Sequence, residues 1–287
     1  MKQPMTTLNN GIEMPQIGLG VWNTKNGEEV VIAVDTAIKA GYRLIDTAAV
    51  YGNEEGVGEG IRRSGIKREE LFVTTKVWNS DQGFESTLKA FDTSLEKLGL
   101  DYVDLYLIHW PAPELDKYLE TWKAMEQLHQ EGRVKAIGVC NFTIEHLDRL
   151  IKESEILPTV NQVELHPYFQ QVAMREFCKG NDIAVESWSP LGGPGGGGSR
   201  KSDVTPVLDN PVIKAIAAKH DKSAAQIVIR WHLQNDLIVI PKSVHAERIA
   251  ENIDVFDFEL TSEDMDQINA LETGVRGGPD PMTMNSQ

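Results

Sequence analysis

The sequence has little cysteine, no long apolar run and fewer basic than acidic residues, and each shortage excludes a class of protein. Its two cysteines, Cys140 and Cys178, stand in different segments without a C-x-x-C or Cys/His spacing, which argues against a disulfide framework or a zinc site. No apolar run approaches the roughly 18 residues of a membrane-spanning helix, and residues 1–10 lack the basic start and hydrophobic middle of a signal peptide. We therefore expect a cytoplasmic protein with reduced thiols and no membrane partner.

The net charge argues against a nucleic-acid-binding protein. The 28 basic and 43 acidic side chains give a net charge of -15, which repels nucleic acid unless a basic patch overrides it, and we find no such patch. With 41% hydrophobic and 25% charged residues, the 287-residue chain has the makeup of a globular protein with a large core. Length alone leaves open one large domain or two smaller ones.

Short β-branched apolar runs alternate with amphipathic stretches of helical length, which is typical of parallel strands joined by crossover helices. The runs are too continuously apolar for strands with one face in water. Eight such units predict an α/β fold, a (β/α)8 TIM barrel forming a single catalytic domain over residues 1–287. The expected strands are 14–22, 42–48, 71–78, 103–110, 135–142, 159–167, 183–190 and 237–243, and the clearest helices are 28–40, 84–98, 115–131 and 224–234.

Two stretches do not fit the repeat. Residues 191–203, "LGGPGGGGSRKSD", are too rich in glycine for a helix or a strand and predict a long flexible loop after the seventh strand. Residues 274–287 predict a short irregular tail across the surface.

Active sites of such barrels lie at the C-terminal ends of the strands, so polar residues that end apolar runs are candidates. Asp46 ends "YRLID", Tyr51 follows in the next loop, Lys76 ends "LFVTTK" and His109 ends "VDLYLIH". A buried lysine needs a partner to stay charged, and Asp46 is the obvious one. Taken singly, each residue has a plainer explanation. Asp46 can cap a loop, Tyr51 can pack on an amphipathic face, Lys76 can extend its charged end to solvent, and His109 can be a hydrogen-bonded core histidine. Together, on three consecutive strands, they form an acid–base set.

At these residues the sequence resembles the aldo-keto reductases. The similarity runs from "NGIEMPQIGLGVW" through "GYRLIDTAAVYGNEEGVG", "LFVTTKVW", "DLYLIHWP", "GVCNF", "NQVELHP" and "SWSPLG" to "IPKSVHAERIAEN". These motifs resemble those of bacterial members such as the 2,5-diketo-gluconate reductases, which reduce small aldehydes, ketones and keto-sugar acids. The resemblance implies a catalytic tetrad of Asp46, Tyr51, Lys76 and His109.

The chemistry of carbonyl reduction agrees with that set. Hydride addition leaves an alkoxide, so a proton donor is needed, and a free phenol with a pKa of about 10 is a weak one at neutral pH. We expect the Lys76 cation to lower the pKa of Tyr51, Asp46 to hold that cation, and His109 to orient the carbonyl and share the proton.

The cofactor cannot be recognised from a Rossmann motif, because the only "GLG", residues 18–20, lies inside the first strand. Barrels often bind phosphate through the loops after strands seven and eight. Lys242, Ser243 and Arg248 suit a phosphate monoester, although a capping serine among solvated basic residues explains them equally well. The resemblance favours NADP, with His245 where other members often have a basic residue and Cys140 where serine is usual. It implies contacts from Gly20, Val21, Trp22, Asn141, Gln162, Trp188, Leu191, Gly192, Lys242, Ser243, Val244, Arg248, Glu251 and Asn252.

For the substrate we expect an aromatic-walled pocket of moderate size formed by Trp22, Trp78 and Trp110 with His109, each after a strand end. The short tail predicts an open, permissive site, and we expect a monomer that acts on small carbonyl compounds.

Two other functions fit the same fold. One is an NADP-binding sensor or regulatory subunit, against which the intact tetrad argues. The other is a metal-dependent hydrolase or isomerase, for which His109 and His166 are too few ligands, so we expect no metal.

Overall fold

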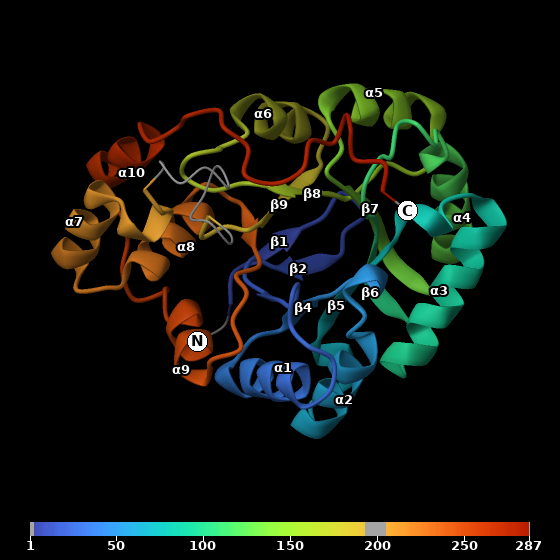
Figure 1. Cartoon of the computed structure of the whole chain (residues 1–287), viewed down its shortest axis with the longest axis horizontal. Helices are drawn as coiled ribbons and strands as arrows, with labels where there is room; N and C mark the ends of the chain where they lie inside the picture. Colours follow the sequence, from blue (N-terminus) through green and yellow to red (C-terminus); the bar gives the residue numbers. More distant parts are fainter. Residues whose placement is uncertain (1–2, 193–204, 287) are drawn as a thin grey trace.

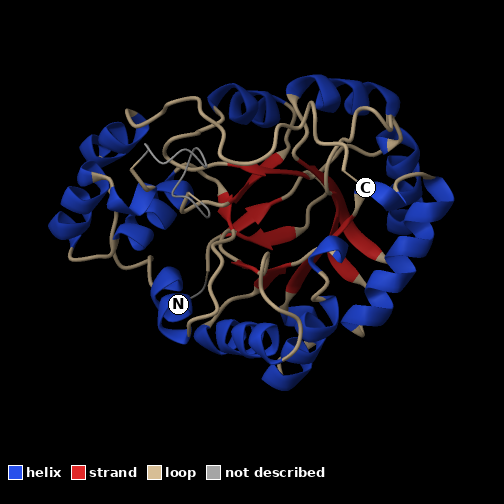
Figure 2. Ribbon diagram, viewed as in Figure 1, coloured by secondary structure: helices blue, strands red, loops and turns tan. Residues whose placement is uncertain are grey.

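The computed structural model describes residues 3–192 and 205–286 and places eight parallel strands in one sheet, in chain order. Helices surround the sheet on all sides (Figure 1), and the strands form the centre of the molecule (Figure 2). This confirms the expected strand–helix repeat. The strands are β3 (Leu19–Gly20), β4 (Leu44–Asp46), β5 (Phe72–Val77), β6 (Val103–Ile108), β7 (Val134–Cys140), β8 (Val160–Glu164), β9 (Ala184–Trp188) and β10 (Ile238–Val239).

The first and last strands close the sheet into a barrel. The backbone N–H of Gly18 donates to Val239 O at 2.9 Å, and the N–H of Val239 donates to Gln16 O at 2.9 Å. Gly20 bridges Lys242 in parallel, and a Cβ on Gly20 would lie 2.9 Å from Ile240 O. A side chain at position 20 would therefore push the two closing strands apart.

The first strand is shorter than predicted, because part of the run assigned to it belongs to another element. Residues 13–15 form β2 (Glu13–Pro15), which pairs antiparallel with β1 (Met5–Thr7) in an N-terminal hairpin. Leu8 and Met14 of this hairpin pack among the apolar side chains inside the barrel. The hairpin thus plugs the barrel end opposite the strand C-termini, and the prediction of one strand over 14–22 was wrong.

Ten helices are found among the described residues, and three of the four that were predicted, over 28–40, 84–98 and 224–234, have the expected bounds. The helix expected over 115–131 begins at Tyr118, because Ala112 and Asp116 adopt positive φ angles in a turn before it. The helices are α1 (Glu28–Ala40), α2 (Glu54–Ser64), α3 (Phe84–Leu98), α4 (Tyr118–Gln130), α5 (Ile144–Glu153), α6 (Val172–Gly180), α7 (Pro211–His220), α8 (Ala224–Gln234), α9 (Ala246–Ile253) and α10 (Ser262–Asn269).

The apolar core has two parts. The larger part lies between the strands and the surrounding helices, and the smaller part fills the barrel interior with side chains such as Leu44, Leu105 and Val160. Towards the C-terminal ends of the strands, polar side chains replace the aliphatic ones, with Asp46, Lys76 and Gln162 all buried. The site therefore rests on a rigid apolar base.

The chain after α10 crosses the side of the barrel where the strands end, as the red trace in Figure 1 shows. Its irregular course was predicted. Most of the glycine-rich stretch expected to be a flexible loop, residues 193–203, lies outside the described residues. No helix in the described part of the chain is both long enough and apolar enough to cross a membrane.

Candidate active site

Asp46 and Lys76 form a buried ion pair at the ends of neighbouring strands. The Lys76 Nζ donates to Asp46 Oδ1 at 2.6 Å and to the backbone oxygen of Thr47 at 2.9 Å, and both charged side chains are at most 2% exposed. Burial is the largest single effect and would lower the pKa of Lys76, but the Asp46 charge and hydrogen bond, together with smaller effects of neighbouring groups, raise it overall. Lys76 is therefore a permanent cation, paired as the sequence predicted.

Tyr51 lies above this pair. It ends a single 3-10 turn, η1 (Ala49–Tyr51), and the Lys76 Nζ lies 5.1 Å from the centre of its ring. Asn53 fixes the loop by donating to the backbone oxygens of Val21 at 3.0 Å and Thr24 at 3.1 Å. These contacts tie the tyrosine loop to the segment after β3.

The pKa of Tyr51 is raised, not lowered as we expected. Burial disfavours the tyrosinate and is the larger effect, while the Lys76 cation opposes it. Tyr51 keeps part of its surface exposed in the free protein. The expectation of a lowered pKa was wrong because it counted the cation and left out burial. Lys76 still stabilises the tyrosinate relative to a site without a cation.

His109 is a neutral imidazole. Burial and the Lys76 cation hold the pKa of this histidine well below its usual value. Its ring meets Tyr51 edge-on with centres 5.6 Å apart and Trp78 edge-on at 5.2 Å. The Nδ1 atom is buried and has no hydrogen-bond partner among the described residues. A neutral imidazole can donate from one nitrogen and accept at the other.

Inside the barrel, Gln162 connects two carboxyl groups. Its Nε2 donates to Asp46 Oδ2 at 2.8 Å and to Glu186 Oε2 at 2.7 Å, and its Oε1 lies 3.6 Å from the Cys140 Sγ. In the free protein this amide is therefore engaged by the barrel. The contact of Gln162 with a nicotinamide carboxamide stays a prediction. Sequence reasoning missed Glu186, although an acid within the apolar run "IAVESW" could have drawn attention to it.

Asn141 and Trp188 are joined at the mouth. Trp188 Nε1 donates to Asn141 Oδ1 at 2.8 Å, and Asn141 Nδ2 donates to the backbone oxygen of His109 at 3.0 Å. Asn141 also takes a left-handed conformation, with φ of 63°. The structure thus brings together two side chains that the resemblance assigns to the nicotinamide.

The residues expected at the 2′-phosphate lie where β10 leads into α9. Lys242 and Arg248 are exposed and form no ion pair with any described acid, and Ser243 is buried with its Oγ accepting from His245 N at 3.1 Å. His245 precedes α9 without a side-chain cap, so the first N–H groups of the helix keep their hydrogen-bonding capacity.

The other expected cofactor contacts differ in exposure. Val21 and Asn252 are buried, whereas Val244, Glu251 and Leu191 are partly exposed. Gly192 adopts a positive φ of 94°.

The three tryptophans expected at the substrate differ in exposure. Trp22 is 50% exposed, Trp78 is partly exposed, and Trp110 is 6% exposed and stacks nearly parallel to His109 with ring centres 6.5 Å apart. Their role as pocket walls stays a prediction.

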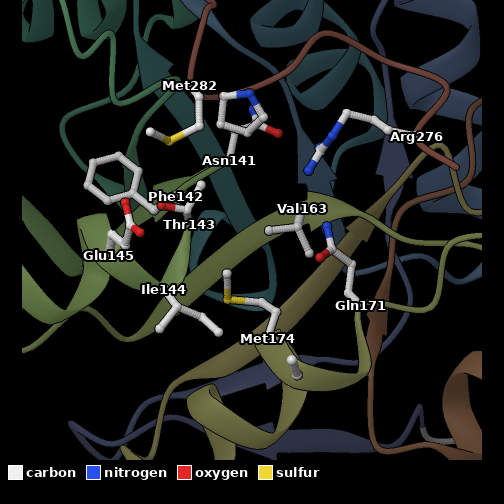
Figure 3. Close-up of a pocket in the computed structure, with 12 residues that line it drawn as sticks. Asn141, Phe142, Thr143, Ile144, Glu145, Val163, Gln171, Met174, Arg276 and Met282 are labelled. Carbon is white, nitrogen blue, oxygen red and sulfur yellow. The ribbon is translucent and has the colours of Figure 1, made fainter. Parts of the chain in front are cut away.

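A cavity of about 400 Å³ lies beside this site and contains none of the four tetrad candidates. Figure 3 shows Arg276 and Met282 of the tail on one side of it and Ile144 and Met174 on the other, with Asn141 at its edge. Within the described ranges, no three His, Cys, Asp or Glu side chains are grouped to hold a metal.

Glu164 holds the tail over the mouth, a role that sequence reasoning missed. Its carboxylate accepts from the backbone N–H groups of Gly277 at 2.7 Å and Gly278 at 2.9 Å, and from His166 Nε2 at 3.0 Å. A Cβ on Gly278 would lie 2.4 Å from the Trp188 ring, so the backbone there runs flat against the indole. The tail thus contacts an expected nicotinamide residue.

Comparison with known proteins gives one consistent family. The model of the Aldo/keto reductase family matches residues 16–273. Glyoxal reductase of Bacillus subtilis is 55% identical over 274 residues, 96% of this chain and 95% of that protein. Methylglyoxal reductase DkgA of Escherichia coli is 51% identical over 274 residues, again 96% and 95%. A solved mutant of Gox0644 in complex with NADPH has a TM-score of 0.90 at 48% identity and covers 99% of both chains. This chain therefore belongs to the aldo/keto reductase family.

Proposed function

We propose that this protein reduces small aldehydes and ketones to alcohols with NADPH, and that Tyr51 is the proton donor. The observation that carries the proposal is the buried Lys76–Asp46 pair beneath the Tyr51 ring, with neutral His109 beside it. The family match and the glyoxal and methylglyoxal reductases among its relatives support the same chemistry.

Each residue of the tetrad has a separate task. NADPH, when bound, supplies the hydride that reduces the carbonyl carbon. Tyr51 gives its phenolic proton to the carbonyl oxygen, and a proton from solvent later restores the phenol. Lys76 stabilises the tyrosinate that forms, Asp46 keeps Lys76 in place, and neutral His109 donates a hydrogen bond to the substrate oxygen. The neutral state of His109 suits this task, since an imidazolium next to Lys76 would add a second buried cation.

The residues after β10 fit the 2′-phosphate of NADP. Lys242 and Arg248 are cations without acid partners among the described residues, and the uncapped start of α9 leaves N–H groups that can bind an anion. The solved relative in complex with NADPH supports NADP as the cofactor. We propose Asn141, Trp188 and Gln162 as the nicotinamide contacts.

The substrates we propose are small aldehydes, ketones and keto-sugar acids, bound between Trp22, Trp78 and Trp110. An exposed Trp22 at the mouth suits an open pocket that accepts several such compounds. We also propose a single catalytic domain in a monomeric, cytoplasmic protein.

The test is a spectroscopic assay of the purified protein. NADPH is mixed with the protein and a panel containing glyoxal, methylglyoxal, simple ketones and a keto-sugar acid, and the loss of NADPH absorbance is followed against controls without substrate. Saturable oxidation with at least one carbonyl supports the enzyme. Tight NADPH binding with no oxidation across the panel would favour the sensor function instead.

A further inference from the structure

Glu186 is a buried acid that the proposed mechanism does not use. It lies in the middle of β9, with no exposed surface, and pairs in register with Gln162 of β8 and Ile238 of β10. Its Oε2 accepts from Gln162 Nε2 at 2.7 Å, and its Oε1 has no partner among the described residues. A buried carboxylate with a single hydrogen bond is costly, whereas a neutral carboxyl group is not.

The charges around Glu186 also favour its neutral form. The side chains that face it from the other strands are Asp46 of β4, Lys76 of β5, Cys140 of β7 and Gln162 of β8. Lys76 is the only cation among them, and it is already paired with Asp46. A second ionised carboxyl would therefore leave the barrel interior with an unpaired negative charge.

We propose that Glu186 is a positioning residue that, as a neutral acid, holds the Gln162 amide against Asp46 and so keeps the Asp46–Lys76 pair under Tyr51. Ionisation of Glu186 switches the site to a less active state. The chain of contacts is continuous, from Glu186 to Gln162 at 2.7 Å, to Asp46 at 2.8 Å and on to Lys76 at 2.6 Å.

The charge of Glu186 changes near pH 8. Burial, and after it the Asp46 charge, raise the pKa of Glu186 to about 8. Burial also raises the pKa of Cys140 and of Tyr51, and Asp46 raises that of Lys76, so these groups do not lose protons near pH 8. His109 is already neutral there. Glu186 is thus the facing group that changes charge between pH 7 and 9.

The direction of the effect follows from the charge that develops on Tyr51. Reduction turns the phenol into a tyrosinate, and an additional negative charge inside the barrel disfavours that form. Ionised Glu186 also repels Asp46 across the shared amide. Both effects slow reduction as pH rises, and the released proton goes to solvent.

Glu186→Gln tests the proposal because glutamine copies the shape of the neutral acid and cannot ionise. At saturating NADPH, we expect kcat of the wild type to fall about 3- to 10-fold between pH 7 and 9 with a midpoint near 8, and kcat of the variant to stay level. Glu96→Gln, an exposed acid on α3, is the matched control and should follow the wild-type profile. Parallel profiles for the wild type and Glu186→Gln would overturn the proposal.

A second measurement does not depend on enzymatic turnover. Its outcome is therefore independent of the proposed function, on which the kinetic test rests. The folded-state pKa of Glu186 lies above the unfolded value, so the wild type binds more protons when folded and loses stability as pH rises from about 5 to 8. Relative to Glu186→Gln, the melting temperature of the wild type should fall by roughly 5 °C over that range. A constant difference between the two proteins would mean that Glu186 is ionised throughout and does not act as a switch.

Discussion

Trp188 donates its indole N–H to the side-chain oxygen of Asn141, which joins the ends of β9 and β7 across the mouth of the barrel. Asn141 in turn donates to the backbone of His109. Two of the three residues proposed to hold the nicotinamide are therefore in position before any cofactor arrives, and a preformed site binds with less loss of conformational freedom.

This pairing predicts that Trp188→Phe weakens NADPH binding while an aromatic face remains. Loss of one neutral hydrogen bond costs about 0.5–1.5 kcal/mol, which is roughly 2- to 12-fold in the dissociation constant. The measurement is a titration of NADPH fluorescence in a double-mutant cycle with Asn141→Ala. We expect coupling between the two changes, because each removes the same contact. Strictly additive effects would mean that the hydrogen bond does not contribute to the site.

Tyr51→Phe should keep NADPH binding and lose most carbonyl reduction. Only the proton donor is removed, and general acid catalysis contributes about 10²–10⁴-fold. The ring, its contact with His109 and its position over Lys76 are all retained. Turnover is measured with the best substrate of the panel, together with the NADPH dissociation constant. Turnover close to that of the wild type would remove Tyr51 from its proposed role.

Lys76→Met should abolish turnover and destabilise the fold, because Asp46 is left buried without its cation. Removing one partner of a buried ion pair costs about 3–5 kcal/mol. Urea denaturation measures this loss, and the control is the double variant Asp46→Asn, Lys76→Met. With no charge left unpaired, the double variant should recover much of the stability but none of the activity. A single variant as stable as the wild type would contradict the pairing.

Arg248→Ala should weaken NADPH binding and hardly affect NADH, because only NADPH carries the 2′-phosphate. Charge-assisted hydrogen bonds at such a site contribute about 1.5–3 kcal/mol, roughly 10- to 150-fold in affinity. Both dissociation constants are measured by quenching of tryptophan fluorescence at one salt concentration. Lys123→Ala, an exposed cation on α4 without an ion pair among the described residues, is the control for general loss of charge. Equal losses for the two cofactors would place Arg248 at their shared part.

The sequence predicted the barrel because apolar runs and amphipathic stretches alternate so regularly, and it predicted Asp46, Lys76 and His109 as site candidates because each ends such a run. Other features depend on contacts that no local pattern encodes. The hairpin was missed because only three residues separate residues 13–15 from the first barrel strand. Glu186 was missed because it lies in the middle of a strand and not at its end. The raised pKa of Tyr51 reflects burial, which arises only in the folded structure. The tail looked irregular, and it is, but its position depends on Glu164.

The tail gives the last prediction, through Gly278. A Cβ at this position would lie 2.4 Å from the Trp188 ring and 3.1 Å from Glu164 Oε2, so Gly278→Ala must push the tail away from both. We expect the tail to open more often and trypsin to cleave after Arg276 on the order of 10-fold faster, which is the effect of losing about 1.4 kcal/mol of local stability. Cleavage is followed by mass spectrometry under native conditions. Gly180→Ala, whose Cβ would meet no atom within 4 Å, is the control and should be cleaved like the wild type. Unchanged cleavage in Gly278→Ala would mean that the contacts with Trp188 and Glu164 do not hold the tail in solution.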